Sequence, residues 1–164
     1  MKDAWKISKG SKKVRIGIVD SGVNWQHEDL ADNIWVNPND TLDGKDNDGD
    51  GKIDDIRGWD FTAGSTMEAL QAGDTISEDN DPSNTYVTHG TLCAGLVSAV
   101  TNNGKGIAGF GYGCTIIPAK CGFEIENYPA LMNTNEAIKY MVVVLSLEKI
   151  LRKLTARQPT QQDI

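Results

Sequence analysis

The distribution of apolar residues along the chain predicts two buried strands and two helices. Near-continuous apolar runs at Val14–Asp20 and Cys114–Lys120 are typical of central strands in a parallel sheet, where helices cover both faces. The apolar segment Thr88–Val100 predicts a buried helix with Thr88 as its N-cap, and Thr134–Met141 begins a second helix. The order strand, loop, helix, strand, helix predicts an α/β fold with a parallel sheet flanked by helices.

Polar segments separate these elements. Residues Asn33–Ser83 are long, polar and rich in Gly and Asp, with one apolar island at Gly58–Phe61, and Asn102–Gly113 form a glycine-rich connection. A loop as long as the first usually has a function or is organised by an ion. Towards the end of the chain an apolar stripe at helical spacing predicts an amphipathic helix. Its members are Leu147, Ile150, Leu151 and Leu154.

Composition narrows the class of protein. The chain has 164 residues, which suits one domain, and a formal net charge of −7, which disfavours nucleic acid as a partner. No apolar stretch reaches the length that spans a membrane, and the N-terminal MKDAWKISKG lacks the apolar core of a signal peptide. The three cysteines are an odd number, so at least one thiol has no partner within the chain, and the compartment stays open.

Two polar residues stand at the ends of apolar elements. Asp20 ends the first predicted strand, at the sheet edge where α/β proteins bind ligands, and His89 opens the first predicted helix. Singly, each has a structural explanation: Asp20 can cap the turn at Ser21–Gly22, and a lone His at a helix start is more often structural than catalytic. Together they fit an acid–base pair, because an Asp can fix the tautomer of a His whose other ring nitrogen acts as general base.

The sequence around both residues resembles a known family. IGIVDSGVNWQHEDL (Ile16–Leu30) is similar to the Asp motif of subtilisin-like serine proteases, and THGTLCAG (Thr88–Gly95) is similar to their His motif, in the same chain order. The resemblance extends over Ala4–Met141. It implies a partial subtilisin-like fold in which Asp20 is the orienting acid and His89 the general base.

The His motif departs from the family pattern at two positions. Leu92 stands where members usually have a second His, which is not the catalytic base. Cys93 stands where many members have Val, although one subgroup has Cys there, close to the catalytic His. The alternative explanation for Cys93 is a small buried apolar residue, because free Cys is commonly buried.

The segment DGKDNDGDGKIDD (Asp43–Asp55) is crowded with carboxylates. Residues 32–60 hold nine Asp against three Lys or Arg, and this imbalance indicates a cation site. Three acids alternate before Gly51, as in the first half of an EF-hand loop, where such side chains converge on Ca²⁺. They are Asp46, Asp48 and Asp50.

The second half of an EF-hand loop is not matched. Its twelfth position should be a bidentate acid but is Arg57, so Asp54 or Asp55 is expected to complete the shell. The alternative is a solvated acidic loop, but carboxylates this dense repel one another unless a cation gathers them. Some subtilisin-like proteases carry a similar insertion ending in GWDF, found here at Gly58–Phe61. We therefore expect Ca²⁺ as a cofactor.

The serine nucleophile that the family resemblance requires is not found. GST at Gly64–Thr66 is in the wrong place and order, and Ser146 has no glycine-rich turn around it. The resemblance ends near Met141. We therefore expect residues 1–141 to be the N-terminal part of a subtilisin-like peptidase domain, truncated before the Ser motif, and residues 142–164 to be a divergent helical tail.

Two functions are compatible with these features. The first is a subtilisin-like serine endopeptidase acting on polypeptides, of which this chain is a fragment with Asp20 and His89 but no nucleophile, inactive alone. The second is a non-catalytic calcium-binding or interaction module. Neither involves nucleic acid or a membrane. Family members are commonly secreted, but no signal peptide is present here, and neither compartment nor substrate preference follows from the sequence.

Overall fold

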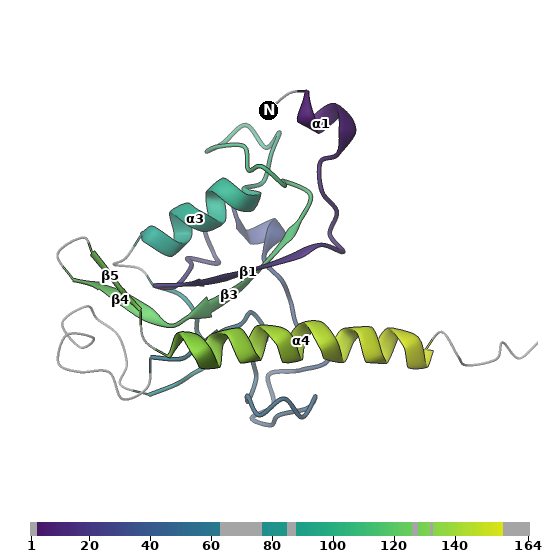
Figure 1. The fold of residues 1–164 in the computed structure, drawn as a ribbon, viewed down its shortest axis with the longest axis vertical. Helices are drawn as coiled ribbons and strands as arrows, with labels where there is room; N and C mark the ends of the chain where they lie inside the picture. The colour runs from purple at the N-terminus through teal and green to yellow at the C-terminus, as the bar shows by residue number, and fades with distance from the viewer. Residues whose placement is uncertain (1–2, 63–76, 85–87, 126–127, 132, 156–164) are drawn as a thin grey trace, which may run out of the picture.

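The computed structural model describes residues 3–62, 77–84, 88–125, 128–131 and 133–155. Their backbone forms a short helix, one 3₁₀ turn, two sheets and two longer helices (Figure 1). In chain order the elements are α1 (Ala4–Ile7), β1 (Arg15–Asp20), η1 (Ala31–Asn33), β2 (Trp59–Asp60), α3 (His89–Ser98), β3 (Thr115–Lys120), β4 (Gly122–Ile125), β5 (Tyr128–Leu131) and α4 (Thr134–Thr155).

The main sheet has three parallel strands in the order β1-β3-β2. β3 lies in the centre and all of its residues are buried, which explains why its sequence is apolar throughout. β1 was predicted as a central strand too, but within the described sheet it pairs with β3 alone, and of its residues only Ile18 is buried. The register aligns the last residues of the three strands: Asp20 and Asp60 are both partners of Lys120. Chain segments far apart in sequence thus end at one edge of the sheet.

Helices cover both faces of this sheet, α3 on one side and α4 on the other (Figure 1). Ile18 and Ile116 pack in one cluster with Ala94 of α3. Ile117 and Ala119 belong to a second cluster, on the side of α4; that cluster also contains Trp35, Trp59, Phe61, Tyr140, Met141 and Val144. Alternate strand residues therefore face opposite helices, and the predicted α/β class is confirmed.

The start of α3 confirms the position of the predicted N-cap but not its side-chain bond. Thr88 precedes the first helical residue, and its carbonyl accepts a hydrogen bond from the Leu92 amide. Its side chain makes no cap hydrogen bond, and its backbone lies in the right-handed helical region at φ −102° and ψ −14°. The helix ends at Ser98, two residues before the predicted end.

The predicted second helix is longer than its sequence signal. α4 runs from Thr134 to Thr155 and passes without a break through residue 141, where the sequence placed a boundary between peptidase domain and tail. That boundary stays a prediction. The side chains of the stripe Leu147, Ile150, Leu151 and Leu154 lie outside the described residues, as does the GST at residues 64–66. In the described part of the chain, no helix combines the length and apolarity needed to cross a membrane.

Candidate active site

The predicted pair Asp20 and His89 comes together at the carboxyl edge of the main sheet. Asp20 is the last residue of β1, and His89 is the first residue of α3, which packs on the same strand. The Nδ1 atom of His89 lies 2.8 Å from Oδ1 and 3.0 Å from Oδ2 of Asp20. The Asp20 side chain is 13% exposed and that of His89 is 45% exposed.

The turn after β1 holds the carboxylate in place. Oδ1 of Asp20 accepts hydrogen bonds from the backbone amide of Ser21 at 2.7 Å and from its hydroxyl at 3.1 Å. The same Ser21 hydroxyl oxygen accepts a bond from the Gly90 amide, and Asn84 donates to the Ser21 carbonyl. The acid thus accepts from the turn and from His89, and the turn itself is tied to α3.

Two glycines allow this close approach. A Cβ on Gly90 would lie 2.2 Å from the Gly22 carbonyl oxygen and 3.1 Å from the Asp20 Cβ, so any side chain there would separate α3 from the turn. Gly22 has φ +106°, which side-chain-bearing residues rarely adopt. The glycines in the Asp and His motifs therefore serve the contact between Asp20 and His89.

The geometry fixes what the imidazole can do. With its proton on Nδ1, the ring donates to Asp20, and Nε2 is then the ring nitrogen that carries a lone pair. If Nε2 takes up a second proton, the carboxylate stabilises the imidazolium. The pair can therefore act as a general base that abstracts a proton from a nucleophile.

Cys93 lies next to this pair. Its Sγ is 3.9 Å from Nδ1 of His89, one helical turn away, and the residue is half-buried rather than fully enclosed. Burial, together with the negative charge of Asp20 and a hydrogen bond to it, raises the pKa of the Cys93 thiol. The thiol thus stays protonated at neutral pH and borders the Asp20 side of the imidazole.

Comparison with known proteins agrees with this geometry. The sequence profile described as the Subtilase family matches residues 11–152 of this chain. The chain belongs to the subtilase family.

Curated relatives of this subtilase chain are proteases. It is 37% identical over 106 residues to thermitase of Thermoactinomyces vulgaris, covering 65% of this chain and 25% of thermitase. It is 33% identical over 106 residues to the thermophilic serine proteinase of Bacillus sp. strain AK1, covering 65% and 18%. It is 36% identical over 97 residues to subtilisin-like protease 1 of Plasmodium vivax, covering 58% and 13%. The chain thus matches a quarter or less of the length of each relative.

The acidic loop of this subtilase chain gathers three of the five predicted metal ligands. Asp46, Asp48 and Asp50 each place one carboxylate oxygen within 4.8 Å of the others. Gly49 and Gly51 have φ of +78° and +92°, which bends the loop around them. Burial, and then the charges of the neighbouring aspartates, raises the pKa of Asp50 to about 6.

One oxygen in this cluster suits a cation. Oδ2 of Asp50 is buried without a hydrogen-bond partner, whereas Oδ1 accepts from the Lys52 amide at 2.9 Å. Hard carboxylate oxygens are the ligands that Ca²⁺ prefers, and a buried carboxylate oxygen without a donor is costly unless an ion neutralises it. The residues present therefore fit a calcium ion.

The other two predicted ligands make different contacts. Asp54 accepts hydrogen bonds from the amides of Asp43 and Gly44. Asp55 is completely buried; one oxygen accepts from Asn37 and the other from the Tyr140 hydroxyl on α4, both at 2.6 Å. Both residues lie outside the group of three, and their place in a calcium shell stays a prediction.

Asn37 connects the acidic cluster to Asp55. Its amide donates both to Asp55 and to Oδ2 of Asp48, at 3.1 Å. Burial raises the pKa of Asp55 to about 7, against the effect of its hydrogen bonds from Tyr140 and Asn37. Sequence reasoning missed this role of Asn37 because an Asn before an acidic loop is an ordinary turn residue.

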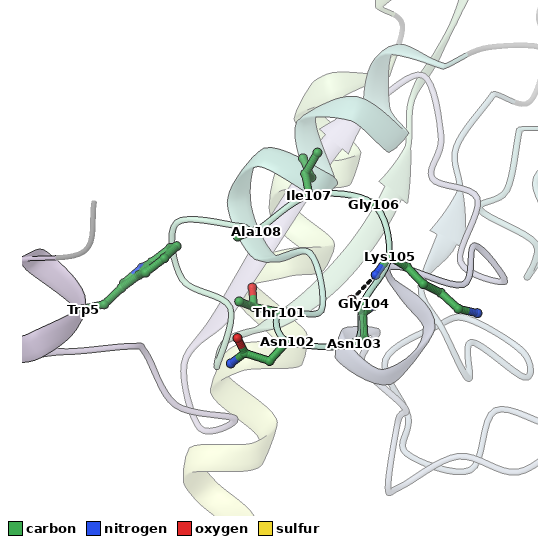
Figure 2. A pocket seen from close by; sticks show the side chains of 9 residues that line it. All are labelled: Trp5, Thr101, Asn102, Asn103, Gly104, Lys105, Gly106, Ile107 and Ala108. Atoms are coloured by element: carbon green, nitrogen blue, oxygen red, sulfur yellow. Dashed lines mark hydrogen bonds between the residues drawn. The ribbon is translucent and has the colours of Figure 1, made fainter.

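A separate hollow of about 470 Å³ lies between Trp5 and the glycine-rich loop 101–108 (Figure 2). The buried Asp29 holds this loop in place, because its carboxylate accepts hydrogen bonds from the side-chain amide of Asn103 and from the backbone N–H of Ile107. Lys105 pairs with Glu28 at 2.5 Å instead of presenting its charge to the hollow. None of the residues that line it belongs to the Asp20–His89 pair or to the acidic cluster.

Sequence reasoning also missed a buried ion pair at the sheet edge. Lys120 Nζ lies 2.8 Å from Oδ2 of Asp60, with side chains only 5% and 1% exposed. The available signal was that the apolar run IIPAK ends on a charged residue, just as IGIVD ends on Asp20. Ser146, by contrast, lies exposed on α4, so the structure does not favour it as a nucleophile.

Proposed function

We propose that this subtilase chain supplies the acid and base of a serine endopeptidase site. The main support for this proposal is that both oxygens of Asp20 lie within 3.0 Å of His89 Nδ1, which orients the imidazole and makes Nε2 the basic nitrogen of the ring. His89 takes the proton of a serine hydroxyl as that oxygen attacks the carbonyl carbon of a peptide bond, and then gives the proton to the leaving amine. Asp20 holds the ring and stabilises its charged form. The substrate class is polypeptide.

The nucleophile is not assigned to a residue of this chain. The isolated chain is therefore expected to leave casein and chromogenic peptides uncleaved and to resist labelling by a fluorophosphonate probe. Without the serine, covalent catalysis is lost and only a small residual rate over water is left. Stoichiometric labelling of any serine in the folded chain would contradict this assignment.

A chimera tests the roles of Asp20 and His89 directly. The segment of this chain that aligns with thermitase would replace its counterpart in that protease, and peptide hydrolysis would be measured. We expect activity in the chimera, loss on His89→Ala, and a loss of about 10⁴-fold on Asp20→Asn, the size seen when the orienting acid of a triad is changed. The matched control is His27→Ala, which removes the other, exposed histidine of the chain. Equal losses in the His27 and His89 variants would refute the assignment.

We also propose that Ca²⁺ binds Asp46, Asp48 and Asp50. The convergence of three carboxylate oxygens and the buried, partnerless Oδ2 of Asp50 support this. The ion would neutralise the cluster and stabilise the loop that precedes β2. A calcium-binding module without catalysis is the second candidate function, and it would be favoured if the chimera binds Ca²⁺ but stays inactive while its Asp20–His89 contact is intact by NMR.

A further inference from the structure

The ends of the three parallel strands form a row of charges. Asp20, Lys120 and Asp60 are register partners across β1, β3 and β2. Partners on neighbouring parallel strands point to the same face, and the even-numbered residues Ile18 and Ile116 face α3. The row therefore lies on the α3 side of the sheet, the side from which His89 approaches Asp20.

Lys120 passes close to the turn that carries Asp20. A Cβ built on Gly22 would lie 3.1 Å from Cδ of Lys120. The carbonyl oxygen of the same Gly22 lies close to Gly90, the residue after His89. The lysine ends in the buried pair with Asp60, with Nζ and Oδ2 2.8 Å apart. Its stem thus packs against the turn that follows Asp20, and Lys120 is the register partner of Asp20 itself.

The charge of Lys120 acts beyond its partner. Burial alone would raise the pKa of Asp81, but hydrogen bonds from Trp25 and Ser83 and the positive charge of Lys120 lower it. Cys121, the next residue of the chain, shows the opposite influence: burial, with the charges of Asp20 and Asp60, raises its pKa to about 11. Cys93 on α3 is a further titratable group that interacts with Asp20.

A fully buried ion pair is poor evidence for stability, because desolvation of both ions offsets their attraction. It is better explained by its position. Without the ammonium group, the row would hold only the carboxylates of Asp20 and Asp60. The negative charge of both would favour the imidazolium form of His89. A general base must be neutral when the reaction begins.

We propose that Lys120, held by Asp60, is a positioning residue that lowers the basicity of His89 through its charge beside Asp20. This inference rests on the proposed function of the Asp20–His89 pair. The alternating carboxylate, ammonium and carboxylate groups let Asp20 orient the imidazole without driving it into the charged form. Lys120 touches neither substrate nor the reacting atoms, and acts only through the pair.

Ring-proton NMR of the full chain tests this, because the chain has only two histidines, His27 and His89. Lys120→Met should raise the titration midpoint of His89 by about half a pH unit or more, since a nearby cation is lost. Asp60→Asn should lower it, because the lysine charge is then uncompensated. Lys120→Arg, which keeps the charge, should leave the midpoint near that of the parent. His27 is the internal reference in every sample.

Two further variants separate the possible outcomes. Lys139→Met removes the same charge from an exposed pair on α4 and should leave His89 unchanged. Asp20→Asn should lower the His89 midpoint if the proposed pair exists. A shift with Asp20→Asn but none with Lys120→Met or Asp60→Asn would overturn the role of Lys120 and leave the proposed function intact. If Lys120→Met does not fold, the Asp60→Asn result alone decides, and an unchanged or raised midpoint refutes the proposal.

Discussion

The buried carboxyl of Asp55 should make the chain less stable as pH rises. Burial raises its pKa from 3.8 to about 7, so the folded state binds the proton more tightly than the unfolded state. The resulting stability is fully present below about pH 3.8 and is lost as pH rises through about 7. At about 1.4 kcal/mol per pKa unit, the whole effect is on the order of 4 kcal/mol.

Urea unfolding of the full chain at pH 5 and pH 8, with EDTA present, measures this effect. We expect the unfolding free energy to fall by about 1–3 kcal/mol between these two values, because most of the titration lies in that window. Added Ca²⁺ should reduce the fall, since a cation bound to the acidic cluster offsets the negative charges of Asp48 and Asp50 near Asp55.

A matched pair of variants isolates the residue responsible. Asp55→Asn should remove the larger part of the fall, because the amide does not titrate and only the smaller pKa shift of Asp50, to about 6, is left. Asp54→Asn is the control, because it removes the neighbouring carboxylate instead. Residue 54 has φ +60°, which Asn tolerates, and this variant should show the same fall in unfolding free energy as the parent. Stability that rises from pH 5 to pH 8 in the parent, or a fall that persists in the Asp55 variant, would refute the reasoning.

Three further predictions concern other parts of the chain. Calorimetry should detect Ca²⁺ binding that is weakened by Asp48→Asn or Asp50→Asn, and a flat titration of the folded chain would remove the calcium proposal. A small maleimide should modify Cys93 more slowly in the folded chain than in denaturant, and His89→Ala should change that rate; identical rates in parent and variant would argue against their contact. Removal of residues 142–164 should increase binding of hydrophobic dyes, because it deletes Val144 from the core beside Met141. A truncated chain that stays monomeric and melts cooperatively above about 60 °C would contradict this.

Sequence reasoning succeeded where a local pattern determines the structure. β3 is apolar because both of its faces are covered, and that composition is visible without a structure. The apolar run of β1 also predicted a strand, although its place at the edge of the described sheet did not follow from it. The contact of Asp20 with His89 followed from two general rules. Functional residues gather at the carboxyl ends of parallel strands, and a catalytic imidazole is commonly oriented by a carboxylate. The subtilase family was predicted from the motifs around the same two residues, and the family profile confirms it.

It failed where the outcome depends on register or on distant partners. β2 has only two residues, too few for a periodic signal, so the pairing of Asp60 with Lys120 was invisible. Asp55 looked like a loop acid, but Tyr140, 85 residues away in the sequence, provides its partner. Thr88 holds the predicted N-cap position, yet its side chain makes no cap hydrogen bond, and residue type alone does not reveal the helical backbone angles found there.

Because β1 pairs with β3, the first strand is synthesised well before its partner. Arg15 pairs with Thr115, so among the strands that the structure describes the partner of β1 is made only after a further 100 residues have been added. At a translation rate of about 5–20 residues per second, that delay is about 5–20 s. Throughout it, the apolar strand IGIV is exposed with both edges unpaired, a state that favours association with other chains. Binding by a chaperone early in synthesis would therefore aid this chain more than assistance after release from the ribosome.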